Sequence, residues 1–394
     1  MNESRILIAG AGIGGIVAAL ALLHRGFEVS LYEQAAEVHE FGAGLQISPN
    51  GSSVLRELGL QSAMEAVVSF PTAREMRLFD TGQTWRVENV ADAAARFGSP
   101  FWLVHRGDLH RALVTALERR APGALHVGAR CVGFEQDAAG VTLLLENGER
   151  VRADALIGAD GVHSRIREAL FGGTPAEFTG FMAWRGVVPM ERLPAPLRQG
   201  AFVGWRGPRG YIITYPLRRG ELLNFVTGIE RDDWLIESWL EAGTVEECRC
   251  DFATWHQDVL TIVDAIDTPY KWALLGRQPL RHWSVGRVSL LGDACHPMVP
   301  SLGQGANMAI EDGMVLARCL EESADVPAGL RRYEVARLDR TSRIVLQSLE
   351  AISLMCNNPQ LADPEQAKVF MDREFTRFAR NEWLYEFNAM TAPI

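Results

Sequence analysis

The sequence has no long apolar run and few cysteines, and each shortage excludes a class of protein. No stretch approaches the roughly 20 consecutive apolar residues that a membrane-spanning helix needs, so we expect no such helix. The six cysteines are scattered; Cys248 and Cys250 lie close together, but no second pair or histidine cluster completes a zinc-binding spacing. We therefore expect reduced, mostly buried thiols and no metal site.

Basic residues are too few for a protein that binds nucleic acid. The chain carries 39 Lys and Arg against 49 Asp and Glu, a formal net charge of -10, whereas phosphate binding needs clustered Lys and Arg. An acidic substrate would need a local basic pocket. The N-terminus leads into an apolar strand without the basic region, apolar segment and cleavage site of an export signal, so the cytoplasm is the expected location.

What the sequence does contain is a pattern of α/β elements. Its 394 residues, 47% hydrophobic and 22% charged, are typical of a globular protein with a sizeable core. A strand over Arg5–Ala9, a helix over 16–25 and a strand over Glu28–Tyr32 form one βαβ unit. The apolar runs 155–159 and 288–291 are predicted to be buried parallel strands.

The middle of the chain differs in character. Short runs rich in aromatic and β-branched residues, at 184–188, 211–216 and 222–227, predict an antiparallel sheet. The α/β pattern then returns, and long helices close the chain. We expect an α/β fold in which a Rossmann-like domain with a parallel sheet is interrupted by a β-sheet substrate domain. The predicted segments are 1–177 (dinucleotide domain, with inserted β segments that join the substrate domain), 178–282 (β-rich substrate domain), 283–330 (dinucleotide domain) and 331–394 (C-terminal helices).

A glycine-rich turn follows the first strand. Gly10-Ala11-Gly12-Ile13-Gly14-Gly15 fits G-x-G-x-x-G: Gly10 permits the turn, Gly12 lets the backbone approach a pyrophosphate, and Gly15 packs helix on strand. The helix that follows directs its positive dipole end at the diphosphate. Glu33 ends the second strand, where a carboxylate can accept hydrogen bonds from ribose hydroxyls.

Two further motifs connect the chain with a known family. One is Ala159-Asp160-Gly161-Val162-His163-Ser164-Arg165-Ile166-Arg167, and the other is Leu291-Gly292-Asp293-Ala294-Cys295-His296-Pro297, continuing from Gly303-Gln304-Gly305-Ala306-Asn307 to Asp312. With the N-terminal fingerprint, they resemble the group A flavoprotein aromatic hydroxylases, typified by para-hydroxybenzoate hydroxylase. Gly-Asp-Ala-Cys-His-Pro-Met and Tyr215-Pro216-Leu217-Arg218 are most similar to the subgroup of salicylate hydroxylase, 3-hydroxybenzoate 6-hydroxylase and 6-hydroxynicotinate 3-monooxygenase.

The resemblance implies FAD as the bound cofactor. Asp293 would bind its ribityl and pyrophosphate part, Arg106 would contact it, and the loop around Gly303 would lie beside the isoalloxazine. For Asp160, a structural ion pair or helix cap is an equal alternative to a nucleotide contact. The cofactor-binding residues expected on this basis are Gly10, Gly12, Gly14, Gly15, Glu33, Gln34, Gly44, Arg106, Asp160, Asp293, Pro300, Gly303, Gly305, Ala306 and Asn307.

The resemblance also implies the reaction. NADH or NADPH would reduce the flavin, O2 would add at flavin carbon 4a, and the hydroperoxide would transfer one oxygen to a small hydroxylated aromatic acid of the salicylate, hydroxybenzoate or hydroxynicotinate type. No second G-x-G-x-x-G is present, which agrees with transient binding of the nicotinamide. The sequence does not choose between NADH and NADPH.

Tyr211, Tyr215 and Gln304 are the candidates for catalytic or substrate contact. The two tyrosines share one face of a predicted strand because they are evenly spaced, although either could be a core aromatic. Several relatives have histidine where this chain has Tyr211, which leaves the substrate and the ring position open. Gln304 could donate to a ring substituent or simply brace a helix turn, and His296 is expected to be structural.

Other interpretations stay open. Arg185 and Arg209 are available donors for a substrate carboxylate, although most arginines are surface charges. The substrate could instead be a quinolone, a urate-like heterocycle or a polyketide, and a flavin-binding oxidase or regulatory module is the alternative of another class. Apolar residues of the C-terminal helices could form a homodimer surface or cover the flavin domain; they are Leu346, Leu349, Ile352 and Leu354.

Overall fold

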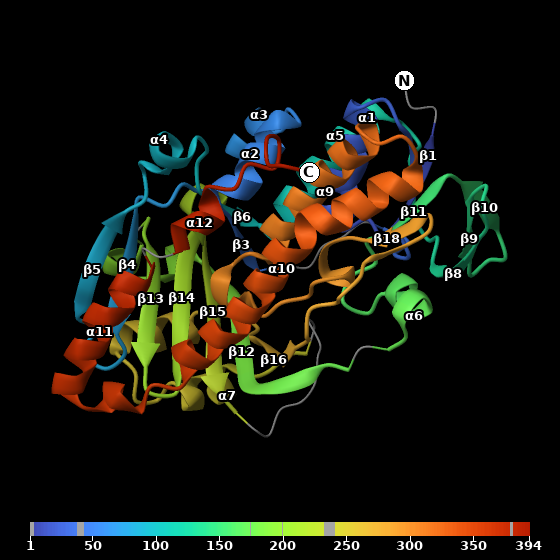
Figure 1. Ribbon diagram of the computed structural model, residues 1–394. Coiled ribbons are helices and arrows are strands. Elements are labelled where there is room, and N and C mark those ends of the chain that lie inside the picture. The colour runs from blue at the N-terminus through green and yellow to red at the C-terminus, as the bar shows by residue number, and fades with distance from the viewer. Residues whose placement is uncertain (1–3, 38–42, 174, 199, 232–240, 379–380) are drawn as a thin grey trace.

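The N-terminal strand β1 (Arg5–Ala9) lies inside a largely parallel sheet of the computed structural model, which describes residues 4–37, 43–173, 175–198, 200–231, 241–378 and 381–394 (Figure 1). β1 pairs in parallel with β2 (Glu28–Tyr32) and β11 (Ala155–Gly158). The three strands are mostly apolar and buried, as expected of parallel strands covered on both faces. The six-stranded order is β17 (Ser284–Val285), β18 (Val288–Leu290), β11, β1, β2 and β7 (Leu125–His126).

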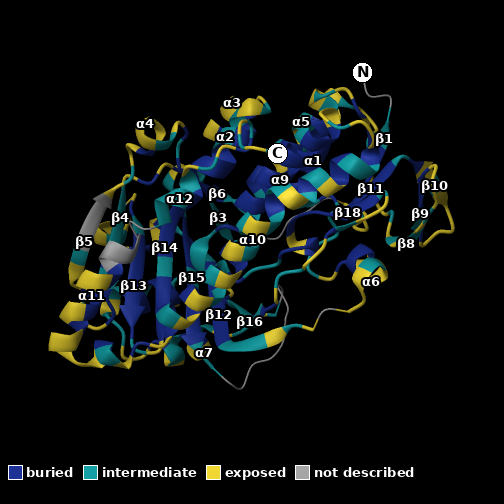
Figure 2. Ribbon diagram, viewed as in Figure 1, coloured by how far each residue is buried: buried dark blue, intermediate teal, exposed yellow. Residues whose placement is uncertain are grey.

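Three helices lie beside this sheet, and the first of them packs against the other two. They are α1 (Ile13–His24), α5 (Arg106–Arg120) and α9 (Gly305–Glu321). Figure 2 shows α9 mostly buried, although its sequence is partly polar. The helix α1 begins three residues before the predicted position because Gly14 and Gly15 belong to its first turn, where they pack closely on their neighbours.

The second sheet has seven strands and holds most of the middle of the chain. Its order is β16 (Tyr270–Gly276), β12 (Glu177–Pro189), β15 (Leu222–Glu230), β14 (Gly210–Leu217), β13 (Phe202–Gly207), β4 (Ala73–Leu78) and β5 (Thr84–Asn89). Neighbours are antiparallel except β13 and β4. The strands β4 and β5 come from the N-terminal part of the chain, so two distant segments build one surface.

Short elements connect and flank the two sheets. The strand β3 begins at Gly44. The remaining elements are β3 (Gly44–Ile47) paired with β6 (Trp102–His105), a sheet of β8 (Cys131–Gln136), β9 (Val141–Leu145) and β10 (Arg150–Ala153), and the helices α2 (Pro49–Glu57), α3 (Gln61–Glu65), α4 (Ala93–Phe97), α6 (Arg165–Phe171), α7 (Val245–Asp251) and α8 (Gln257–Asp264).

The C-terminal helices run across both sheets. The long helix α10 (Val326–Cys356) passes from the first sheet to the second, and α11 (Pro364–Phe378) and α12 (Glu382–Tyr385) follow it (Figure 1). The long helices expected at the end of the chain are α10 and α11, and the short α12 is a further element. Of the stripe proposed as a dimer surface, Ile352 is buried within the chain, Leu349 packs against the second sheet, and Leu346 is exposed.

None of the helices in the described part of the chain has the length and apolar character needed to cross a membrane.

Candidate active site

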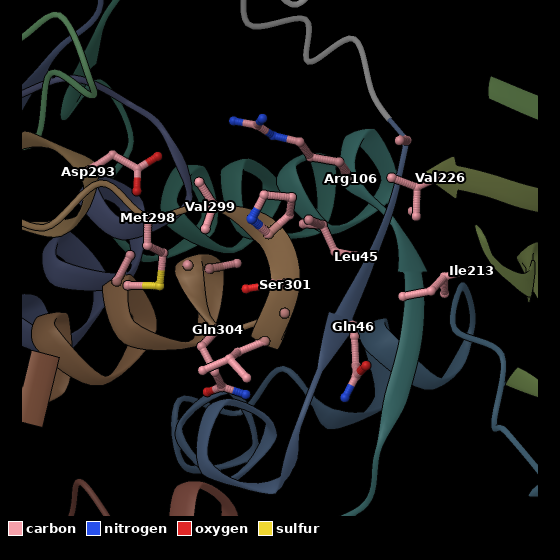
Figure 3. A pocket seen from close by; sticks show the side chains of 18 of the residues that line it. Leu45, Gln46, Arg106, Ile213, Val226, Asp293, Met298, Val299, Ser301 and Gln304 are labelled. Atoms are coloured by element: carbon pink, nitrogen blue, oxygen red, sulfur yellow. The ribbon is translucent and has the colours of Figure 1, made fainter. Parts of the chain in front are cut away.

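A cavity of about 390 Å³ separates the glycine turn from the inner face of the seven-stranded sheet. Figure 3 shows side chains from both sides converging on it: Asp293, Met298, Val299, Ser301 and Gln304 from the loop before α9, Ile213 and Val226 from the sheet, and Leu45, Gln46 and Arg106 between them. The cavity therefore lies where the two sheets meet.

The first glycine turn presents bare backbone to the cavity. Gly10 has φ +104°, and a Cβ there would lie 2.3 Å from the carbonyl oxygen of Ala159; a Cβ at Gly15 would lie 2.0 Å from the carbonyl oxygen of Gly10. A Cβ at Gly12, in contrast, would meet no atom within 4 Å and would project into space beside the start of α1. This arrangement fits a diphosphate, which needs open backbone at a helix N-terminus.

The turn is fixed from behind by polar contacts. The carboxylate of Glu33 accepts hydrogen bonds from the backbone N–H groups of Ala11 (2.8 Å) and Ala35 (2.9 Å). The imidazole Nε2 of buried His110 lies 2.7 Å from the carbonyl oxygen of Ala11. Glu33 is thus at the end of β2 as predicted, with both carboxylate oxygens already bonded to backbone.

A second glycine turn starts α9 on the opposite side. Gly303 has φ +64°, and α9 begins two residues later at Gly305. The Gln304 amide donates to the hydroxyl of Ser48 (3.0 Å) and accepts from Asn50 (3.1 Å). Asn307 accepts from the backbone N–H of Ser48 and donates to the carbonyl of Gly303. The amides of Gln304 and Asn307 therefore tie this turn to α2.

Asp293 is an acidic side chain that projects into the cavity. It is accessible because it faces the cavity, yet protein surrounds it, and this desolvation raises the pKa of its carboxyl while His296, Arg106 and Arg277 oppose the rise. A carboxylate held there can accept hydrogen bonds from hydroxyl groups of a ligand.

A buried charge cluster lies behind the α9 turn. Arg337 is fully buried and donates to Glu311 (2.6 Å) and Asp312 (2.7 Å), and His296 Nε2 lies 2.6 Å from Asp312. Burial alone would raise the pKa of Asp312, but His296 and Arg337 outweigh it and lower that pKa. His296 is therefore structural, as expected. Cys295, His296 and Asp312 also lie within ligand distance of one another, but Arg337 and the backbone of Gly292 already bond to Asp312.

The inner face of the seven-stranded sheet forms the opposite wall. Cross-strand neighbours share a face, and one row of such neighbours lines the cavity across five strands: Arg185, Val226, Ile213, Gly204 and Met76. The row is apolar except for Arg185 at one end.

Arginines dominate the charge of the cavity wall. Arg185 is 8% exposed, and burial, reinforced by nearby Arg106, lowers the pKa of its guanidinium to about 10, so it is charged at neutral pH. Arg206, two residues beyond Gly204, is 2% exposed and also lines the cavity. Glu75, which contributes to the wall as well, pairs its carboxylate with Arg77 (2.6 Å). The cavity therefore suits an anionic ligand.

The two tyrosines share a face of β14, as predicted, but differ in environment. Tyr215 lines the cavity and stacks on Phe202 at 5.4 Å. Tyr211 is 1% exposed and packs with Ile352, Met355 and Cys356 at the end of α10, which covers it. Burial raises the pKa of both phenols well above their usual value.

Comparison with known proteins identifies the family. The sequence profile described as FAD binding domain matches residues 3–348. The chain is 38% identical to the 3-amino-4-hydroxybenzoate 2-monooxygenase PtnB3 of Streptomyces platensis, over 100% of this chain and 98% of that protein. The chain belongs to the flavoprotein aromatic hydroxylases.

Further relatives of this flavoprotein hydroxylase agree in sequence and in fold. The 6-hydroxynicotinate 3-monooxygenase of Pseudomonas fluorescens is 38% identical over 87% of this chain and 90% of its own length. Among solved structures, Klebsiella pneumoniae HpxO complexed with FAD and uric acid is 27% identical, with a TM-score of 0.87 over 99% of this chain and 97% of that one. The protein is an FAD-binding enzyme, and the open backbone of its glycine turn fits the diphosphate of that cofactor.

The structure brings most of the predicted site residues of the hydroxylase to the cavity. Those that line it are Gly12, Gly14, Gly15, Gly44, Arg106, Tyr215, Asp293, Pro300, Gly303, Gln304, Gly305 and Ala306. Gly10, Glu33, Gln34, Asp160, Asn307 and Tyr211 are described residues that lie outside the lining.

Asp160 has a structural place. Its carboxylate accepts hydrogen bonds from the Ser164 hydroxyl and from the backbone N–H groups of Arg165 and Ile166, so it caps α6. Arg167 donates to the carbonyl of Ala294 at 3.0 Å. These contacts are those of a helix cap, which the sequence left open for Asp160 as the alternative to a nucleotide contact.

The rest of the sheet wall and the C-terminal contribution were not predicted from the sequence. Phe202, Gly204 and Arg206 occupy every second position of β13 and so share one face of the strand. This spacing was the sequence signal from which they could have been predicted. Leu384 and Tyr385 of α12 also line the cavity, but no motif marks them.

Proposed function

We propose that this enzyme uses NADH or NADPH and O2 to insert one oxygen atom into a small hydroxylated aromatic acid, with FAD as cofactor. The observation that carries the proposal is the sheet wall, where buried Arg185 and Arg206 flank an apolar surface made by Val226, Ile213 and Gly204. An aromatic ring would lie on the apolar part and a carboxylate would pair with a guanidinium.

The glycine turns are the proposed seat of the cofactor. The start of α1, with Gly12, would hold the diphosphate. Asp293 would accept hydrogen bonds from the ribityl chain, and Arg106 would lie beside it. The start of α9 would direct its N–H groups at the flavin ring, where they favour negative charge. FAD, when bound, supplies the reduction and oxygen chemistry.

The residues of the wall have complementary tasks. Arg185 would bind the carboxylate and fix the orientation of the ring, because a guanidinium forms two parallel hydrogen bonds with a carboxylate. Val226, Ile213 and Met76 would hold the ring and exclude water from the reacting atoms. The amide of Gln304 already bonds to Ser48 and Asn50, so its proposed part is to brace the turn.

Arg185→Gln is expected to raise KM for an aromatic carboxylate by roughly 10- to 100-fold, since a hydrogen bond to a charged group contributes about 1.5–3 kcal/mol. The value of kcat should change much less. The matched control is Arg209→Gln, because the Arg209 side chain is 76% exposed and pairs with Glu230 on the surface. Steady-state oxidation of NADH or NADPH, followed at 340 nm against substrate concentration, measures both constants. Equal effects of the two substitutions would contradict the role of Arg185.

Tyr211→Phe is expected to leave substrate affinity and turnover within about twofold of wild type, because the ring lies under α10 and not in the cavity wall. Tyr211→Ala should cost about 3–5 kcal/mol of stability, the usual result of removing a buried aromatic ring. Steady-state kinetics test the first expectation and urea denaturation the second. A large loss of turnover in the phenylalanine variant would show that the Tyr211 hydroxyl takes part in the reaction.

The substrate test is a comparison of aromatic acids. The purified flavoprotein would be mixed with NADH or NADPH and with salicylate, 3-hydroxybenzoate, 4-hydroxybenzoate, 6-hydroxynicotinate or 3-amino-4-hydroxybenzoate. The expected result is a many-fold faster oxidation with one acid and a product heavier by one oxygen. Urate belongs in the same panel, because HpxO shares the fold and its structure contains uric acid. Acceleration by urate alone would favour a heterocycle as substrate.

A further inference from the structure

The C-terminal segment contributes to the cavity although it lies beyond the family match. Leu384 and Tyr385 of α12 are cavity-lining residues, whereas the family profile ends at residue 348. The match to PtnB3 spans 100% of this chain, and the match to the 6-hydroxynicotinate 3-monooxygenase spans 87%. The family profile therefore does not define this part of the wall.

A series of neighbouring planar groups connects α12 with the seven-stranded sheet. Tyr215 stacks on Phe202 with ring centroids 5.4 Å apart and planes 4° apart. The guanidinium of Arg74 lies 5.4 Å from the centroid of Phe202 and 5.9 Å from that of Phe101. Phe101 in turn meets the ring of Tyr385 edge-on at 4.8 Å. Four of the five groups line the cavity, and Phe101 supports them from behind.

The short helix α12 is fixed by charged groups of its neighbours. Arg340 donates to the carbonyl of Leu384 (2.9 Å) and pairs with Glu311 of the buried charge cluster (2.8 Å). The guanidinium of Arg343 lies 3.8 Å from the ring centroid of Trp383, and Arg96 pairs with Glu382. The helix that carries Tyr385 is thus anchored from α4 and α10, and the Tyr385 ring itself meets Phe97 and Phe101 edge-on.

We propose that Tyr385 is a specificity-determining residue that closes the outer end of the substrate cavity and restricts the enzyme to acids with a single aromatic ring. This inference rests on the proposed function. Rings packed on one another form a stiff wall, because an aromatic side chain has few rotamers and each ring here is supported by the next. A carboxylate at Arg185 would place the ring on the row that runs to Met76. The next pair on the same face, Arg74 and Phe202, leads through Phe101 to Tyr385, so a fused second ring would extend toward Tyr385.

The experiment compares two acids that differ by one fused ring. Salicylate and 1-hydroxy-2-naphthoate would be titrated into the FAD-loaded protein without NADH or NADPH, and Kd obtained from the change in flavin absorbance. Wild type should prefer salicylate, and Tyr385→Ala should shift the ratio of the two Kd values toward the naphthoate by about tenfold or more. Tyr385→Phe should keep the wild-type ratio.

Controls separate the role of the ring from a change in folding. Val369→Ala, at a 70% exposed position of α11, should leave both Kd values unchanged. Flavin content and melting temperature would be recorded for every variant, and Tyr385→Leu would replace the alanine variant if that variant loses flavin. An unchanged ratio in a variant that still binds salicylate would overturn the inference. If wild type binds neither these two acids nor any other acid of the panel named under the proposed function, that function fails as well.

Discussion

Gly12→Val is expected to give a folded protein that no longer retains FAD. A Cβ at Gly12 meets no protein atom within 4 Å, and the backbone there is ordinary (φ -69°, ψ 179°), so the substitution should cost the free protein about 1 kcal/mol or less. The same side chain would occupy the space in which the diphosphate approaches the start of α1. Overpacking of about 3 kcal/mol weakens binding by more than about 100-fold. The ratio of absorbance at 450 and 280 nm after purification measures retained flavin.

Two further glycines make this expectation specific. Gly133 also has open space around its Cβ but lies on β8, outside the cavity lining, so Gly133→Val should retain FAD. Gly15→Ala should fail differently, because its Cβ would lie 2.0 Å from the carbonyl oxygen of Gly10. That variant should lose folded protein together with flavin. Full flavin retention by Gly12→Val would refute the placement of the diphosphate.

Those parts of the fold whose signal is local could be predicted from the sequence. The strands β1 and β2 begin and end at the predicted residues because their apolar runs, the glycine turn and the helix between them form one βαβ unit of consecutive residues. The loop from Gly303 to Ala306 was also expected at the site, and its residues line the cavity. A glycine motif predicts the local backbone geometry, because few other residues tolerate a positive φ or a close approach of two backbone segments.

Side chains whose role depends on distant packing could not be assigned in this way. Alternation places Tyr211 and Tyr215 on one face of β14, but the end of α10, about 140 residues later in the sequence, covers Tyr211 and leaves Tyr215 at the cavity. A carboxylate that follows a strand can bind a ligand or cap a helix equally well. In this structure the carboxylate of Asp160 caps α6. The contribution of Tyr385 depends on how the last helix docks, for which the sequence holds no periodic signal.

The charge cluster behind the α9 turn connects these distant parts. Glu311 of α9 accepts from Asn50 of α2 at 2.6 Å and pairs with Arg337 and Arg340 of α10. Arg340 also binds the backbone of α12. The same few buried charges therefore hold the α9 turn, the helix α10 that covers Tyr211, and the helix α12 at the outer wall of the cavity. Removal of one of these charges should affect both the stability of the protein and the site.

Arg337→Met is accordingly expected to lower the free energy of unfolding by about 3–5 kcal/mol, the usual effect of removing one partner of a buried ion pair. Arg337 is 0% exposed and bonds to Glu311 and Asp312, which are equally buried. Methionine fills much of the volume but leaves Asp312 paired with His296 and Glu311 paired with Arg340.

Urea denaturation followed by circular dichroism measures this change, and Arg332→Met is the matched control on the same helix. Arg332 pairs with Glu322 at the surface, and such a pair contributes at most about 1 kcal/mol. The loss of unfolding free energy should thus be several-fold larger for Arg337→Met than for Arg332→Met. The Arg337 variant should also lose flavin more readily, because the α9 turn is no longer held. A loss below about 1 kcal/mol for Arg337→Met would mean that apolar packing replaces the cluster without penalty, and the coupling of the cavity to these charges would have to be abandoned.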